Sequence, residues 1–186
     1  TSASNLVRSY NLEDGAIIWQ CAGLTGNATP CPILDGNHVI VMSGYQGHSA
    51  MRIPITSKGD ITSDDQIVWK QERGTPYVPS PVLFDNMLFF NQSNQGIWTV
   101  LDAVSGRVVM DRTRLPGISN MYSSPIAANG RIYVTGRNGL TLVLKPGKSL
   151  SIESSNRLEE RFDSSPSIAG DELYLRGEKF LYCIAE

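Results

Sequence analysis

The sequence has little net charge and no long apolar segment. Its 186 residues carry 16 Lys and Arg against 18 Asp and Glu, which gives a formal net charge of -2 and an isoelectric point near 5.7. This balance excludes the basic footprint that is typical of nucleic-acid-binding domains. No apolar run approaches the roughly 20 residues that a membrane-spanning helix needs. We therefore expect no nucleic acid partner and no membrane span.

The N-terminal segment "TSASNLVRSYNLEDG" lacks both the basic start and the apolar core of a secretory signal peptide. A mature or truncated chain would look the same, so this absence does not place the protein in the cytoplasm.

Cysteine and histidine are scarce. The three cysteines form no CxxC pair, which excludes the thioredoxin-like and zinc-ribbon patterns. A disulfide between Cys21 and Cys31 is conceivable because a turn-rich segment separates them, but free thiols in strands are the favoured interpretation. The two histidines, His38 and His48, are close enough in sequence to touch one metal, although isolated exposed histidines are far commoner.

Motifs for nucleophiles and phosphates are absent as well. There is no GxSxG, no serine combined with His and Asp in a recognisable order, and "GNATPCP" lacks the lysine of a phosphate loop. We therefore expect no catalytic residue, no metal and no cofactor in this chain.

The sequence contains an internal repeat. "SSPIAANGRIYVTG" and "SSPSIAGDELYLRG" share the serines, the proline, the turn and the strand, about 40 residues apart. Each copy has a small residue before the proline and a turn pair rich in Gly, Asn and Asp after it. Apolar residues then alternate, and the residues between them are also apolar or aromatic, as in strands covered on both faces. The four aligned prolines are Pro32, Pro81, Pro125 and Pro166.

Each unit continues through a third and a fourth strand and spans about 40 to 50 residues. A sheet this small cannot bury both faces alone, and radial stacking against its copies gives a propeller blade. A linear β-solenoid is the alternative, but its repeats are shorter. The sequence predicts one all-β domain over 1–186, a β-propeller of four-stranded antiparallel blades with about four blades present. The expected units are 1–28, 29–74, 75–122, 123–162 and 163–186.

The joins between third and fourth strands resemble a known repeat family. Asn11 to Gly15 with Trp19, and Leu101 to Gly106, resemble the docking motif of pyrroloquinoline-quinone-like (PQQ-like) β-propeller repeats, roughly Ala-x-Asp-x-x-Thr-Gly-x-x-x-Trp. In such repeats the tryptophan inserts between blades and the glycine turn places it. The resemblance implies blade-docking roles for Trp19, Trp69, Asp102, Gly15 and Gly106.

The motif is strict in only two or three units. Trp69 is in place, but its turn is expanded over residues 56–65, and Met110 and Ser151 stand where the next two tryptophans are expected. The C-terminal segment "SSPSIAGDELYLRGEKFLYCIAE" also resembles the last blade of secreted bacterial proteins of this superfamily. The resemblance therefore implies an extracytoplasmic location, periplasmic or secreted.

The number of strands raises the question of ring closure, because relatives in this family close rings of seven or eight blades. We expect a C-terminal part of a larger propeller, or a short natural member. A half ring leaves unpaired strand edges, and two copies related by a two-fold axis could complete a ring of eight as a homodimer. In the alternative, a self-closed four-bladed ring, the strand at 16–20 would complete the last blade.

The family resemblance also suggests a second function, that of a quinone-dependent dehydrogenase. Such enzymes need a calcium site of carboxylates and an Asn, a catalytic Asp and a vicinal cysteine pair. This chain has no Cys-Cys and no acidic cluster with ligand spacing. Quinone chemistry in this chain is therefore disfavoured.

A binding surface remains. In propellers, the loops from each fourth strand to the next first strand, and from second to third strands, line one face near the axis. Here these loops bring Tyr and Arg, the residues enriched at binding hot spots, toward one face. In the alternative, the tyrosines pack under neighbouring loops and the arginines pair with nearby carboxylates. The candidate ligand or partner surface is Arg73, Tyr77, Arg112, Arg114, Tyr122 and Arg161.

These observations favour a non-catalytic propeller that binds a protein partner or a small ligand through its loops. It resembles the outer-membrane assembly lipoprotein class and the secreted PQQ-like repeat proteins. Two alternatives stay open: a fragment of a PQQ-dependent dehydrogenase-like enzyme whose catalytic residues lie elsewhere, and a carbohydrate-binding module. The fold alone does not choose between them.

Overall fold

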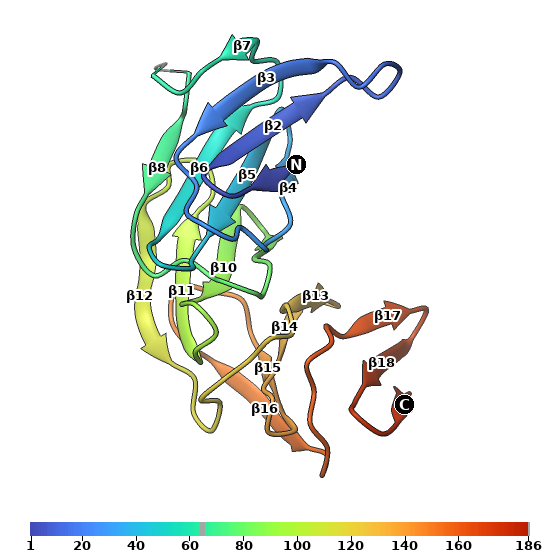
Figure 1. The fold of residues 1–186 in the computed structure, drawn as a ribbon. Helices are drawn as coiled ribbons and strands as arrows, with labels where there is room; N and C mark the ends of the chain where they lie inside the picture. The colour runs from blue at the N-terminus through green and yellow to red at the C-terminus, as the bar shows by residue number, and fades with distance from the viewer. Residues whose placement is uncertain (64–65, 186) are drawn as a thin grey trace.

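The strands gather into five small sheets that lie side by side around an arc (Figure 1). A computed structural model describes residues 1–63 and 66–185. Within these residues the chain forms nineteen β-strands, and no helix there is long and apolar enough to cross a membrane. The chain passes from sheet to sheet in sequence order, so the arc is a partial propeller whose blades are these sheets.

With one exception, each sheet is a single stretch of the chain, and its first strand lies innermost. Sheet 1 is β1 (Ser2–Ala3), β2 (Leu6–Tyr10), β3 (Ile17–Ala22) and the exception β7 (Gly59–Asp60). Sheet 2 is β4 (Ile33–Asp35), β5 (His38–Ser43), β6 (Ser49–Pro54) and β8 (Trp69–Gln71). Sheet 3 is β9 (Val82–Phe84), β10 (Met87–Asn91), β11 (Ile97–Asp102) and β12 (Val108–Arg114). Sheet 4 is β13 (Ile126–Ala128), β14 (Arg131–Thr135), β15 (Leu140–Leu144) and β16 (Ile152–Arg157). Sheet 5 is β17 (Ser167–Ala169), β18 (Glu172–Arg176) and β19 (Leu181–Ile184).

The turn pairs fold the units as hairpins because they accept left-handed backbone. Asp85 and Asn86, between β9 and β10, have φ of 50° and 57°. Asn129 and Gly130, between β13 and β14, have φ of 48° and 70°. Two successive positive φ values give the turn twist that matches two-residue antiparallel hairpins.

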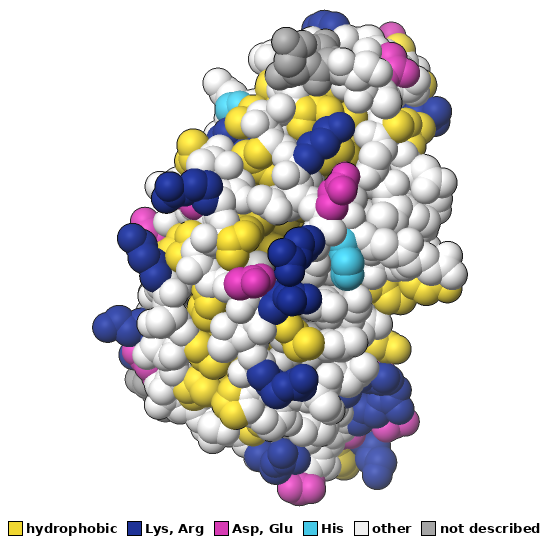
Figure 2. All heavy atoms as spheres, turned by 90° about the vertical axis from the view of Figure 1, so that its left-hand side faces the viewer, with side chains coloured by type: hydrophobic (Ala, Val, Ile, Leu, Met, Phe, Trp, Pro, Cys, Tyr) yellow, Lys and Arg dark blue, Asp and Glu magenta, His cyan; other side chains and the backbone are white. Residues whose placement is uncertain are grey.

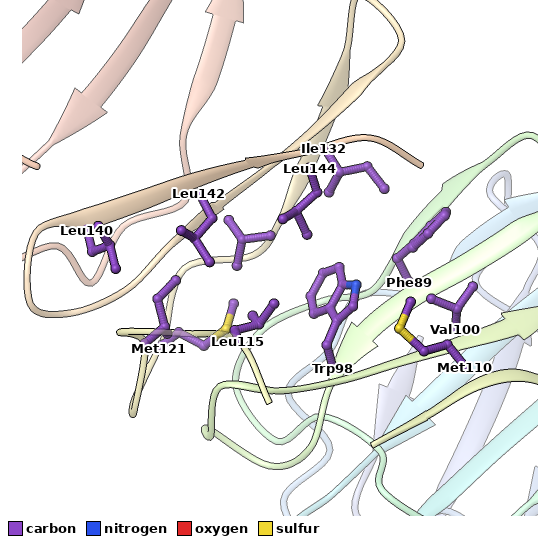
Figure 3. Packing of buried hydrophobic residues seen from close by; sticks show 12 residues of the cluster. Phe89, Trp98, Val100, Met110, Leu115, Met121, Ile132, Leu140, Leu142 and Leu144 are labelled. Atoms are coloured by element: carbon purple, nitrogen blue, oxygen red, sulfur yellow. The ribbon is translucent and has the colours of Figure 1, made fainter. Parts of the chain in front are cut away.

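Neighbouring sheets bury the middle strands on both faces. All five residues of β15 are buried, and so are the first five of β6. Separate apolar clusters fill the interfaces between sheets 1 and 2, 2 and 3, and 3 and 4. Figure 3 shows the third of these, where leucines of β15 face Phe89, Trp98 and Met110 of sheet 3.

The small residue before each repeat proline links one sheet to the next. The backbone N–H of Cys31 donates to Ser80 Oγ at 3.0 Å. In the same way, Ser80 N–H donates to Ser124 Oγ and Ser124 N–H donates to Ser165 Oγ, both at 2.9 Å. A hydroxyl at this position therefore holds the innermost part of the preceding sheet, which explains the recurring serine. Cys31 takes part in this series through its backbone.

Trp69 docks sheet 2 onto sheet 3. Its indole Nε1–H donates to the carbonyl of Ala103 at 2.9 Å, and its side chain is 8% exposed. The ring lies against Gly106, where an added Cβ would come within 2.6 Å of Trp69 Cγ. Gly106 has φ of 69°, and Asp102 shapes the same turn by accepting from the Ser105 N–H at 2.7 Å. The glycine is thus required both for its backbone conformation and for ring contact.

Strand register identifies the outer-strand residue that faces the next sheet, which we call the interface position. In sheet 2, Ile40, Arg52 and Trp69 lie opposite one another across three strands, and Trp69 holds this position. The equivalent rows, from the inner strand outward, are Ser9–Trp19 in sheet 1, Phe89–Val100–Met110 in sheet 3 and Tyr133–Val143–Ser154 in sheet 4.

The residue at the interface position becomes smaller along the chain, from Trp in sheets 1 and 2 to Met110 and then Ser154. The prediction that Ser151 holds this position in sheet 4 is wrong. β16 begins at Ile152, one residue after Ser151, and pairs Ser154 with Val143. A hydroxymethyl group therefore stands where sheet 2 carries an indole.

Trp19 is buried between sheets 1 and 2, but its Nε1–H has no acceptor among the described residues. The turn of sheet 2 that would supply an acceptor carbonyl to the Trp19 indole is the expanded turn at residues 56–65. Part of that turn forms β7, which pairs Gly59 with Trp19 at the outer edge of sheet 1. Asp64 and Asp65 of the predicted turn lie outside the described residues. Gly15, predicted to place a docked ring, has no atom within 4 Å of an added Cβ in this chain.

Three further features differ from or complete the sequence-based expectation. β1 and β7 are short strands that were not predicted. β3, which covers the segment proposed to complete the last blade in the self-closed alternative, pairs instead with β2 and β7. Cys21 is buried, Cys31 and Cys183 are exposed, and all three are free thiols.

Gly106 and Gly15 form a matched pair for testing the docking contact, because both occupy left-handed turns with φ near 70°. Gly15→Ala should cost about 1 kcal/mol of folding free energy through backbone strain alone. Gly106→Ala adds a clash with Trp69 and should cost about 1 to 3 kcal/mol more. Urea denaturation of both variants measures the difference. Equal losses would show that Trp69 does not depend on this glycine.

Asp102 gives the turn a pH dependence. Donation by the Ser105 hydroxyl and amide lowers the pKa of Asp102 below its usual range. Because the folded pKa lies below the unfolded one, the ionised group stabilises the fold above a pH of about 3.9, and this contribution is lost as pH falls through the folded pKa. Asp102→Asn should therefore lower Tm at pH 7, and the gap to the unsubstituted protein should close in acid. A gap that is constant with pH would contradict this, and Ser105→Ala should raise the pKa of Asp102 in an NMR titration.

Candidate functional site

Two sets of loops interlock at one end of the sheets, and we call this end the loop face. One set joins each fourth strand to the next first strand, and the other joins second to third strands. Equivalent backbone hydrogen bonds tie the two sets together in sheets 3, 4 and 5. The bonds run from Ser93 N–H to Thr75 O at 2.9 Å, from Arg137 N–H to Asn120 O at 3.0 Å and from Glu178 N–H to Arg161 O at 3.0 Å.

The predicted surface residues do not form one patch. Arg112 and Arg114 lie in β12, the outermost strand of sheet 3, and not in the linking loop as predicted, because this strand extends to Arg114. Arg73 is exposed in the β8–β9 loop beside Gly74, where an added Cβ would lie 3.6 Å from Arg112 Cγ. Figure 2 shows this outer side, with Lys and Arg dispersed among hydrophobic and uncharged side chains. Arg112 Nε also lies 3.8 Å from Asp111 Oδ1.

Tyr77 belongs to a separate group on the loop face. Its ring packs against Tyr45 of the β5–β6 loop, with centroids 4.8 Å apart. Its hydroxyl accepts from Asn27 Nδ2 at 2.7 Å, so loops from sheets 1, 2 and 3 meet here. Tyr45 remains 38% exposed, which leaves one aromatic ring of the pair open to a ligand.

Tyr122 and Arg161 join a third group, centred on Asp163. The guanidinium of Arg137 lies 4.0 Å above the Tyr122 ring and donates twice to Asp163, once from Nη2 to Oδ2 at 3.0 Å. Arg161 Nη2 donates to the same Oδ2 at 3.1 Å. A bidentate arginine fixed on an aromatic ring is a well-ordered arrangement. Asp163 thereby orients two arginines from neighbouring sheets.

A cavity of about 290 Å³ opens beside this group. Its lining includes Arg161, Asp163 and Ser164 from the β16–β17 loop, and Arg176 and Glu178 from the end of β18 and the loop that follows. Arg176 Nε donates to Ser164 Oγ at 2.7 Å, and no carboxylate of the described residues forms an ion pair with Arg176. This guanidinium therefore has free donors for an anion.

The charged groups of the cavity are not equally neutralised by their partners. Asp163 is neutralised by two guanidinium groups, Arg137 and Arg161. Arg176 has a hydroxyl as its partner, while Glu178 is exposed at the edge. A partly enclosed site with an unneutralised guanidinium favours carboxylate or phosphate oxygens.

The described residues contain no group of three His, Cys, Asp or Glu side chains that could hold a metal ion. His48 Nδ1 lies 3.1 Å from Thr75 Oγ1, and the Thr75 hydroxyl donates to Ser43 O at 2.6 Å. Because that hydroxyl proton is already used, His48 must donate from Nδ1. His48 thus has a bonded role in a loop.

Comparison with solved structures identifies the architecture. BamB from Moraxella catarrhalis matches with a TM-score of 0.55 and 14% identity, over 98% of this chain and 64% of BamB. The computationally designed Ika8 protein matches with a TM-score of 0.72 and 9% identity, over 100% of this chain and 54% of Ika8. The designed Ika4 protein matches with a TM-score of 0.63 and 11% identity, over 88% of this chain and 95% of Ika4.

The chain has a β-propeller fold. At these identities the likeness shows the fold alone. The chain spans less than two thirds of BamB and about half of Ika8. No protein-family model and no curated protein matches the sequence.

Sequence reasoning missed three residues of the cavity and of the group centred on Asp163 beside it, namely Arg137, Asp163 and Arg176. Arg137 and Arg176 belong to "GRNG" and "RGEK", the turns between second and third strands. Since both kinds of loop meet at one end, charged residues in these turns could have been placed beside Arg161. The pairing with Asp163, by contrast, depends on the distance between two sheets.

Proposed function

We propose that this chain is a non-catalytic propeller scaffold that binds a protein partner through its loop face, with an acidic segment of the partner in the cavity beside Arg161 and Arg176. The observation that carries this is the guanidinium of Arg176, which faces a cavity of about 290 Å³ with no carboxylate partner among the described residues. Arg137 and Tyr122 support the site by holding Asp163 and Arg161 in place.

A PQQ-like repeat ancestry and an extracytoplasmic location belong to the same proposal. The Trp69 ring on the Asp102–Gly106 turn supports the first, because it joins blades as the motif requires. Structural likeness to BamB over 98% of this chain supports the propeller architecture on which the scaffold proposal rests.

The pair of Tyr45 and Tyr77 favours a second candidate, carbohydrate binding. An exposed ring beside polar side chains can stack on the apolar face of a sugar while neighbouring groups bind its hydroxyls. A glycan array with the Tyr45→Ala variant as control distinguishes this candidate from acidic-peptide binding.

The arginine site predicts selective loss of anion binding. A fluorescein-labelled hexaglutamate peptide should bind, whereas the matching hexaglutamine peptide should not. The double variant Arg161→Ala, Arg176→Ala should weaken hexaglutamate binding about tenfold or more, because charge-assisted hydrogen bonds contribute about 1.5 to 3 kcal/mol each. Fluorescence anisotropy at low ionic strength measures both peptides.

The matched control is Arg73→Ala, Arg114→Ala, which removes the same charge outside the cavity. Its effect should be small. If the two double variants weaken binding equally, the peptide is held by net charge and the cavity site is refuted.

We also propose that two copies associate through the open side of sheet 5. Phe180 and Leu181 are 63% and 67% exposed, and β19 has one paired neighbour in the described part of the sheet. Exposed apolar residues on an unpaired edge favour pairing with another chain. Light scattering should give about twice the chain mass of 20.4 kDa, and Leu181→Glu should restore the single-chain mass. A single-chain mass for the unsubstituted protein would contradict a dimer.

A further inference from the structure

The interface between sheets 4 and 5 contains an apolar groove of about 290 Å³ that is separate from the arginine cavity. Val143 and Tyr133 of sheet 4 form one wall, and Leu173, Leu175 and Ile184 of sheet 5 form the other. Val143 is 8% exposed and Leu175 is 3% exposed, so the walls are deep.

Ser154 holds the interface position of sheet 4, next to residues that line the groove. Ser154 pairs with Val143, and Asn156 pairs with Thr141. Asn156, Thr141 and Val143 all line the groove, and Asn156 Nδ2 donates to Ser154 Oγ at 3.2 Å. Alternate residues of a strand share a face, so Ser154 faces sheet 5.

The neighbouring interfaces indicate what fits at this position. Between sheets 2 and 3 the same position holds the Trp69 indole. Between sheets 3 and 4 it holds Met110, and the cavity beside Met110 measures about 10 Å³. The architecture thus accommodates an aromatic ring between two blades, and the groove is larger than the engineered cavities of about 150 Å³ that bind benzene.

The lining of the groove includes one positively charged residue. Arg157 lines it and donates from Nη1 to the Asn138 carbonyl at 2.9 Å. No described carboxylate forms an ion pair with Arg157. Apolar walls with one guanidinium at the edge are complementary to a ring that bears an anionic group.

We propose that the groove between sheets 4 and 5 is a binding site for a small aromatic carboxylate. The ring lies between Val143, Leu173 and Leu175, where an interface tryptophan lies between other blades. The carboxylate accepts hydrogen bonds from Arg157. This site is independent of the loop-face proposal.

Two probes that share an indole ring and differ in charge test the proposal on the intact chain. Indole-3-acetate should bind in an NMR titration, and its ring protons should give nuclear Overhauser effects to the methyl groups of Leu173, Leu175 and Ile184. Tryptamine should bind about tenfold more weakly, since it presents an ammonium group to Arg157.

Three variants complete the design. Arg157→Ala should reduce indole-3-acetate affinity to that of tryptamine, whereas Lys148→Ala, an exposed charge in the turn before β16, should not. Ser154→Trp places a ring in the groove and should weaken indole-3-acetate binding at least about tenfold. The smaller change Ser154→Leu should weaken it partly, which guards against a Trp variant that fails to fold.

The contacts measured on the unsubstituted protein decide the question even without variants. Absence of saturable binding, or Overhauser effects to other methyl groups, would overturn the proposal. Equal affinity for the two probes would also overturn it, because Arg157 would then not recognise the carboxylate. Unchanged binding in a folded Ser154→Trp variant would have the same meaning.

Discussion

The structure depends on one constraint, that a four-stranded sheet must be covered on both faces by its neighbours. Two kinds of contact hold neighbouring sheets against each other, one near the hub and one at the outer edge. Near the hub, the backbone N–H before each of the first three repeat prolines donates to a serine hydroxyl of the next sheet. At the outer edge, Trp69 spans to the next sheet and rests on Gly106. The inner contact links successive sheets by a hydrogen bond, and the outer contact fills part of the interface between sheets 2 and 3 with an aromatic ring.

The side chain at the interface position differs from one pair of sheets to the next. The hub contact is nearly constant from sheet 2 to sheet 5, whereas the interface position varies from tryptophan to serine. The open volume is about 10 Å³ beside Met110, about 290 Å³ beside Val143 and about 310 Å³ beside Trp19, so the size of the interface residue alone does not set it.

The repeat could be predicted from sequence because its signals are local. Turn pairs such as Asn129-Gly130 and the alternation that follows fix hairpins without distant contacts. The register of β16 was missed because its residues are all exposed, so no apolar pattern marks its start. β7 was missed because two residues of an expanded turn carry no periodicity. The arginine group was only partly predicted, since the pairing of Arg137 with Asp163 joins residues of different sheets.

β18 connects the two candidate sites. Leu175 faces the apolar groove, and the next residue, Arg176, lines the polar cavity at the loop face. Successive strand residues point to opposite faces, so one short strand presents a side chain to each site. Sheet 5 has three strands in its described part, and its position depends on sheet 4 and on the Glu178–Arg161 backbone hydrogen bond. The groove and the cavity therefore share β18 as a common wall, and sheet 5 contributes residues to both.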